Sequence, residues 1–153
     1  MRRLGLVAAL IATLSLVLVA CGTTVSFETP DGFAQFSDER QPRAISPEGV
    51  VLRMRTVENR PVQDLDFWSE ALERQMIDSG YLPLEKGEFA TSGFDGTWFE
   101  WLAPLNDADW VYLTALAVVE DAIVIAEAAG PYDLYTERRA DLLDSLSTIA
   151  VER

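Results

Sequence analysis

The chain of 153 residues contains no histidine and one cysteine. Without histidine, catalysis by Ser-His-Asp or Cys-His groups, zinc sites built on imidazole and histidine pH switches are excluded. A single cysteine leaves no disulfide within the chain, so the fold must be stabilised by ordinary packing. Basic residues are also scarce, 12 against 25 acidic ones. We therefore expect no nucleic acid among the partners, because polyanions are bound by basic surfaces.

Charged residues are absent from Leu4 to Ala20, directly after the basic start Met1-Arg2-Arg3. A basic segment, an apolar run and small residues at its end predict a secretory signal peptide. The run is at the short limit for a helix that spans a bilayer, so a permanent membrane helix is the alternative.

The run ends in Leu18-Val19-Ala20-Cys21, which resembles the lipobox of bacterial lipoproteins. The resemblance implies that Cys21 receives a diacylglyceryl group, that residues 1–20 are cut away, and that Cys21 begins the mature chain with an acylated amino group. Several acyl chains together anchor a protein durably. Gly22 in place of an aspartate predicts a cell-membrane lipoprotein at the periplasmic face of the outer membrane, if the host is Gram-negative. Residues 21–26 are then a short tether and residues 27–153 a single domain.

Loss of the leader removes Arg2 and Arg3 and moves the formal charge from −13 to −15. Five of the remaining basic residues gather in one short stretch: Arg40, Arg43, Arg53, Arg55 and Arg60. Arg53 and Arg55 are expected on the exposed face of a strand, where they can form a docking edge for an anionic partner. The alternative is that they pair with acidic groups of the domain itself.

Hydrophobic periodicity predicts strands, a helix, more strands and a second helix. Leu65, Trp68, Leu72 and Met76 recur at helical spacing after an N-cap at Asp64 or Asp66, and Ser79-Gly80 ends that helix. The expected strands are residues 27–33 (broken by a Pro-Asp-Gly turn), 50–57, 88–90, 97–102, 110–119 and 122–128, with a helix at 131–146. Residues 37–47 are expected to form a loop, and residues 147–151 an extended tail. An antiparallel sheet packed by two helices, an α+β fold, satisfies this order.

Four features carry a resemblance to a known fold: the Pro-Asp-Gly-Phe33 turn, the helix ending Ser-Gly-Tyr81, the hairpin 111–128 and the closing segment Leu-Leu-Asp-Ser-Leu-Ser-Thr-Ile149. Together they resemble the PsbP-like fold, an α+β sandwich shared by the photosystem II extrinsic protein, a Ran-binding nuclear transport factor and bacterial lipoproteins. The resemblance implies a binding or assembly accessory and transfers no functional residue.

Tryptophans crowd the middle of the chain at Trp98, Trp101 and Trp110. Core packing explains such aromatics in a small domain. The alternatives are an exposed aromatic groove, or an apolar ligand pocket between helix and sheet lined by Trp68, Trp98 and Trp101.

Acidic residues offer two further alternatives. The turn Asn106-Asp-Ala-Asp109 gathers oxygen ligands but lacks a calcium-binding loop pattern, so an ordinary turn explains it. Glu100 paired with Asp95 or Asp109 would suit a carboxylate-dependent hydrolase. The expectation is nevertheless an envelope accessory protein, anchored through Cys21, that binds a protein or envelope component through Arg53, Arg55 or the tryptophans. We expect no catalysis, metal or cofactor; a carrier of a small apolar ligand is the first alternative.

Replacing Cys21 with serine removes the predicted attachment atom. The Cys21→Ser protein should therefore leave the membrane fraction, and globomycin should make the precursor of the unmodified chain accumulate. Fractionation and immunoblotting measure both. Membrane association that survives the substitution would contradict the anchor.

Overall fold

The computed structural model describes residues 23–36, 41–105 and 108–152. Cys21 and the leader lie outside these residues, as do Arg40, Asn106 and Asp107. Within them the strands are β1 (Thr24–Ser26), β2 (Ala34–Gln35), β3 (Arg43–Ile45), β4 (Val51–Glu58), β5 (Leu82–Ala90), β6 (Asp95–Leu105), β7 (Ala108–Val119), β8 (Ala122–Pro131) and β9 (Ala150–Glu152). The helices are α1 (Leu65–Asp78) and α2 (Tyr132–Leu146).

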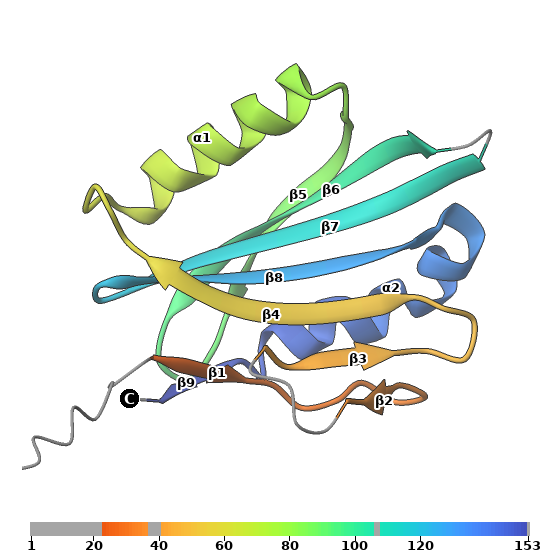
Figure 1. The fold of residues 1–153 in the computed structure, drawn as a ribbon, viewed down its shortest axis with the longest axis horizontal. Coiled ribbons are helices and arrows are strands. Elements are labelled where there is room, and N and C mark those ends of the chain that lie inside the picture. Colours follow the sequence, from red (N-terminus) through yellow and green to blue (C-terminus); the bar gives the residue numbers. More distant parts are fainter. Residues whose placement is uncertain (1–22, 37–40, 106–107, 153) are drawn as a thin grey trace, which may run out of the picture.

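In the described chain, seven strands form one antiparallel sheet in the order β2-β3-β4-β8-β7-β6-β5 (Figure 1). Its centre is the hairpin of β7 and β8, which is buried over most of its length. The turn between β7 and β8 consists of Glu120 and Asp121, as the sequence predicted, and Glu120 takes a positive φ of 55° there. Nearly continuous apolar runs are typical of strands covered on both faces.

Helix α1 begins where the sequence predicts, with the Asp64 carboxylate accepting the amide hydrogen of Phe67 at 2.9 Å. Its end is also as predicted, since Gly80 takes the left-handed φ of 88° that follows a helix. The expected apolar face points to the sheet: Met76 is buried and Leu72 packs beside it. The helix packs on β5, β6 and β7.

Helix α2 packs on β7 and β8 and buries Tyr135, Leu142 and Leu146 in the main core. Leu143, which was also predicted to be buried, is only partly so. The core residues of β7, such as Leu113, alternate with residues such as Thr114 that face α1. The two helices therefore contact opposite faces of the central strands.

Three expectations about the N-terminal part need correction. The segment expected to be a tether, 21–26, includes β1, which pairs antiparallel with β9. The segment expected to be a loop, 37–47, includes β3, because residues 43–45 pair antiparallel with β4. The first strand was placed at 27–33, but the Pro-Asp-Gly turn connects β1 and β2 instead. Such short strands carry little periodicity and form only because a longer strand or a distant segment pairs with them.

No helix among the described residues is long and apolar enough to cross a membrane.

A test of the core compares two leucines. Leu146→Ala should lower the free energy of unfolding by about 2–5 kcal/mol, because Leu146 is fully buried against the sheet. Leu82→Ala removes the same atoms from a side chain that is 56% exposed and should change stability far less. Urea unfolding monitored by circular dichroism measures both. Equal losses would contradict the position of α2.

Candidate functional site: a cavity between α1 and the sheet

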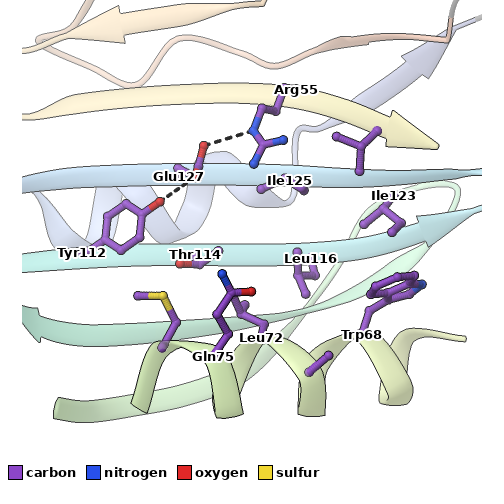
Figure 2. A pocket seen from close by; sticks show the side chains of 13 residues that line it. Arg55, Trp68, Leu72, Gln75, Tyr112, Thr114, Leu116, Ile123, Ile125 and Glu127 are labelled. Atoms are coloured by element: carbon purple, nitrogen blue, oxygen red, sulfur yellow. Dashed lines mark hydrogen bonds and ion pairs between the residues drawn. The ribbon is translucent and has the colours of Figure 1, made fainter. Parts of the chain in front are cut away.

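The face of the sheet that carries α1 contains a cavity of about 360 Å³. Figure 2 shows its lining, which comes from α1 on one side and from β4, β7 and β8 on the other. The cavity exists because α1 packs on β5, β6 and β7 and leaves the space in front of β8 and β4 unfilled. Its volume falls within the usual range for small-molecule sites.

Strand register divides the lining into a polar and an apolar end. Thr114 of β7 stands opposite Glu127 of β8, and Glu127 stands opposite Arg53 of β4. Two residues along, Leu116 stands opposite Ile125. The next such row places Ile123 beside Val57.

Side chains of α1 complete both ends: Trp68 lies beside Ile123, and Gln75 beside Thr114 (Figure 2). The cavity is thus amphipathic along the strand direction.

Glu127 is the central charged group of the polar end, and only 8% of the residue is exposed. Its Oε2 accepts hydrogen bonds from Arg53 Nε at 2.8 Å and from Arg55 Nε at 3.4 Å. Its Oε1 accepts a short hydrogen bond from the Tyr112 hydroxyl (Figure 2). A carboxylate removed from water needs such partners.

Burial raises the pKa of the Glu127 carboxyl, but the hydrogen bonds from Tyr112 and Arg53 and the charges of both arginines outweigh it. The pKa therefore lies below its ordinary value of 4.5, and Glu127 is ionised at neutral pH. Burial and the bond to Glu127 raise the pKa of the Tyr112 hydroxyl, which stays protonated and donates. Two arginines and one carboxylate leave this cluster with a net charge of about +1 at neutral pH.

Thr114 is the second polar feature of the cavity. The residue is 3% exposed, yet its Oγ1 has no hydrogen-bond partner among the described residues. Leaving a buried hydroxyl unpaired costs about 1–3 kcal/mol. Thr114 lines the cavity, but less than 1 Å² of its Oγ1 is exposed, so a molecule inside the cavity can supply the missing partner only once the side chain turns toward it.

Trp68 is fixed at the apolar end by a hydrogen bond. Its indole Nε1 donates to Asn59 Oδ1 at 2.8 Å. Asn59 is 2% exposed, and its Nδ2 donates to the carbonyl of Gln63 at 2.9 Å. This arrangement ties the start of α1 to the end of β4 and holds the indole ring at the cavity wall.

The residues predicted as a partner-binding surface are dispersed by the fold. Arg53 and Arg55 share a face and both bond Glu127, which fits the alternative that they pair with the domain's own acidic groups. Arg55 also lines the cavity, whereas Arg53 is half exposed outside its lining.

Trp101 is 1% exposed and stacks on Phe99 beneath α1, with ring centroids 5.7 Å apart. Trp101 is therefore part of the core and cannot present a contact surface in this fold.

Trp98 lies on the other face of the sheet. It crosses Gly87, where an added Cβ would come within 2.6 Å of the indole, and Arg139 stands over its ring at 5.6 Å. The sequence placed a possible ligand pocket between helix and sheet, lined by Trp68, Trp98 and Trp101. The structure has a cavity there that Trp68 lines, whereas Trp98 and Trp101 lie outside its lining. Trp110 is partly buried near the start of β7, outside the cavity lining.

Glu100, considered as a catalytic carboxylate, is held in an ion pair. Arg139 donates to both of its oxygens, from Nε at 2.9 and 3.0 Å, and the Tyr135 hydroxyl donates at 2.7 Å. Strand alternation places Asp95 on the opposite face, while Asp109 pairs near the far end of β6. Glu100 is therefore placed with neither. Among the described residues, no group of three or more acidic or cysteine side chains could hold a metal ion.

Sequence reasoning missed Thr114, Gln75 and Glu127 as site residues. A signal was present for Glu127, the one charged residue within the apolar run Ala122–Ala128. A charged side chain inside a central strand needs a partner of opposite charge nearby. Arg53 and Arg55, which were expected on the exposed face of their strand, could have been recognised as that partner. Thr114 gave no such signal, because threonine is ordinary in strands.

No protein-family model matches the chain, and no curated protein matches it. Solved structures do match. The cyanobacterial PsbP protein CyanoP from Synechocystis sp. PCC 6803 superposes with a TM-score of 0.58 at 9% identity, covering 84% of this chain and 87% of that one.

LpqN, described as involved in cell envelope biogenesis of Mycobacterium tuberculosis, gives a TM-score of 0.52 at 14% identity over 86% and 85% of the two chains. PA94, a protein of unknown function from Pseudomonas aeruginosa, gives 0.51 at 9% over 86% and 83%. The likeness supports a PsbP-like fold and, at such identities, the fold alone.

The Glu127 cluster predicts a pH dependence. Because the pKa of Glu127 is lowered on folding, its contribution to stability is complete above pH 4.5 and is lost as the pH falls through the lower folded-state pKa. Glu127→Gln should therefore cost about 1–3 kcal/mol at neutral pH and progressively less well below 4.5.

Urea unfolding across this pH range measures the difference from the unmodified chain. Glu137→Gln, at an exposed position on α2, is the control and should show no such convergence. A penalty for Glu127→Gln that is equal at all pH values would contradict the ion cluster.

Proposed function

We propose that the chain is a lipid-anchored binding protein of the cell envelope that holds a small molecule with a large apolar part between α1 and the sheet. The observation that carries this proposal is the amphipathic cavity with the unpartnered Thr114 hydroxyl in its wall. A closed core would have left no room for a ligand. Apolar walls with a few convergent polar groups are typical of small-molecule sites.

The envelope location rests on two separate observations. The first is the lipobox-like segment ending at Cys21, which predicts export and anchoring. The second is the likeness in fold to LpqN, a protein described as involved in cell envelope biogenesis. Fold likeness alone does not transfer function, so Cys21 carries the greater part of this argument. The same likenesses support a PsbP-like sandwich with one helix on each side of the sheet.

A binding role is favoured over hydrolysis because the buried carboxylates are occupied. Glu127 accepts from two arginines and a tyrosine, and Glu100 from Arg139 and Tyr135. A general acid or base must have an oxygen free to exchange a proton with a substrate.

A macromolecular partner at Arg53 and Arg55 stays a prediction. Any test of it by charge reversal would place a second carboxylate beside Glu127 and destabilise the fold. Neutral substitutions are therefore the appropriate variants there.

Closing the cavity mouth tests the proposal. Ala71 is an exposed residue of α1 that borders the cavity, so Ala71→Trp should fold normally and obstruct entry. Uptake of an apolar fluorescent probe such as N-phenyl-1-naphthylamine should fall by about tenfold or more, the loss expected when a bulky group displaces a ligand's apolar contacts.

Glu70→Trp introduces the same side chain at a neighbouring exposed position of α1 outside the cavity lining. This control should bind the probe as the unmodified chain does. Equal binding by all three proteins, or no binding by any of them, would contradict the proposal.

A further inference from the structure

We infer that the natural ligand is a single-chain amphiphile with an anionic head group, of which a fatty acid is the simplest example. The head group would lie at Arg55 and Thr114, and the chain would extend along Leu116 and Ile123 toward Trp68. This inference rests on the proposed binding function and adds the chemical class and orientation of the ligand.

Charge at the polar end favours an anion. Arg53 and Arg55 carry two positive charges, and Glu127 neutralises one of them. Of the two arginines only Arg55 borders the cavity, with a side chain that is 31% exposed. Its guanidinium has five donor hydrogens in a planar fork, and the hydrogen bond to Glu127 engages the one on Nε. A carboxylate or phosphate matches the geometry of such a fork.

Two neutral groups complete a place for the head group. The buried Thr114 hydroxyl lacks a partner and can donate to an anionic oxygen once its side chain turns toward the cavity. Gln75, exposed on α1 across the mouth from the sheet, can donate from its amide nitrogen (Figure 2). A cation is disfavoured, because Glu127 already has three hydrogen-bond donors.

The apolar end of the cavity fits a chain rather than a second polar group. Beyond Arg55 the floor consists of Leu116 and Ile123, both 5% exposed, and the end wall is the indole of Trp68. The one polar atom of that indole already donates to Asn59. Burying methylene groups here contributes about 0.8 kcal/mol each.

The orientation of the cavity relative to the predicted anchor points to a lipid source. The Thr56 hydroxyl, near the end of β4, donates to the carbonyl of Thr23 at 3.0 Å. Thr23 is two residues from Cys21, so an acylated Cys21 would hold this end of the sheet near the membrane. Val57 and Ile123, at the apolar end of the cavity, lie at the same end of β4 and β8. A membrane amphiphile that enters head first would thus reach Arg55 with its chain still pointing to the bilayer.

The experiment uses the full-length acylated protein in detergent-free lipid nanodiscs. Isothermal titration calorimetry measures the affinity for three probes whose alkyl chains have the same length. Dodecanoate should bind, while dodecanol and dodecyltrimethylammonium should bind at least about tenfold more weakly, the difference expected for one charge-assisted hydrogen bond. Arg55→Met should weaken dodecanoate binding by a similar factor and leave dodecanol binding unchanged.

Arg60→Met is the matched control. The substitution removes one positive charge, as Arg55→Met does, but from an ion pair on the surface, in which the side chains of Arg60 and Glu58 are 80% and 77% exposed. It should leave the affinity for every probe unchanged.

Thr114→Val distinguishes ligand recognition from a structural role. Removing a buried hydroxyl without a partner should keep or raise the melting temperature of the ligand-free protein. The same substitution should weaken dodecanoate binding several-fold, because the ligand loses a donor. A merely structural Thr114 would change stability and affinity in the same direction.

Chain orientation is measured by quenching of tryptophan fluorescence. Dodecanoate brominated at its terminal carbon should quench Trp68, and dodecanoate brominated next to the carboxylate should quench it much less. The Trp68→Phe protein supplies the background from the other tryptophans.

The outcomes separate this inference from the proposed function. Equal binding of dodecanoate and dodecanol, with no effect of Arg55→Met, would overturn the anionic head group and leave an apolar-ligand site. Stronger quenching by the bromine next to the carboxylate would overturn the orientation. Failure of every probe to bind would overturn the proposed function as well.

Discussion

The structure depends on a sheet whose central hairpin, β7 and β8, must be covered on both faces. Helix α2 covers one face with fully buried Leu142 and Leu146. Helix α1 covers the other but packs on the β5–β7 half, where Met76 meets Phe99 and Trp101. The remaining part of that face is left with a cavity in place of a filled core. Unequal coverage by two helices of similar length is thus the physical origin of the candidate site.

The same constraint explains why a charged group can sit in a central strand. Glu127 faces the incompletely covered side, where Arg53 and Arg55 reach it from β4 and Tyr112 from β7. On the α2 side of the sheet, the other buried carboxylate of the described residues is Glu100 of β6, which is held by Arg139 and Tyr135. Both clusters satisfy buried charge, but the first borders the cavity of about 360 Å³ under α1, whereas Glu100 borders a smaller hollow of about 180 Å³ beside β5. Position relative to the helices, more than residue type, separates a structural ion pair from a candidate binding group.

Much of the fold was predictable because its long elements carry strong local signals. The bounds of α1 followed from a cap at Asp64 or Asp66, of which the structure uses Asp64, from apolar spacings of three and four residues, and from Gly80. The hairpin followed from two apolar runs around Glu120 and Asp121. The short strands β1, β2 and β3 were missed or misplaced, since each owes its conformation to a partner elsewhere. The tail expected to be extended at 147–151 overlaps β9, which pairs with β1. Among the cavity residues, Trp68 was predicted to line a pocket, and Arg55 was predicted to form a docking edge for an anionic partner. Thr114 could be recognised as a cavity residue only from the position of α1.

The sequence by itself determined the class of the protein: an acidic α+β domain without histidine, preceded by a segment that predicts lipid attachment at Cys21. Composition and local periodicity suffice for such conclusions, because they depend on neighbours along the chain. Only the tertiary structure decided which face each tryptophan occupies relative to the helices, which carboxylate the arginines of β4 bind, and that space remains under α1. These features arise from contacts between residues far apart in the chain, where one polar atom left unpaired at Thr114 can mark a site that no motif records.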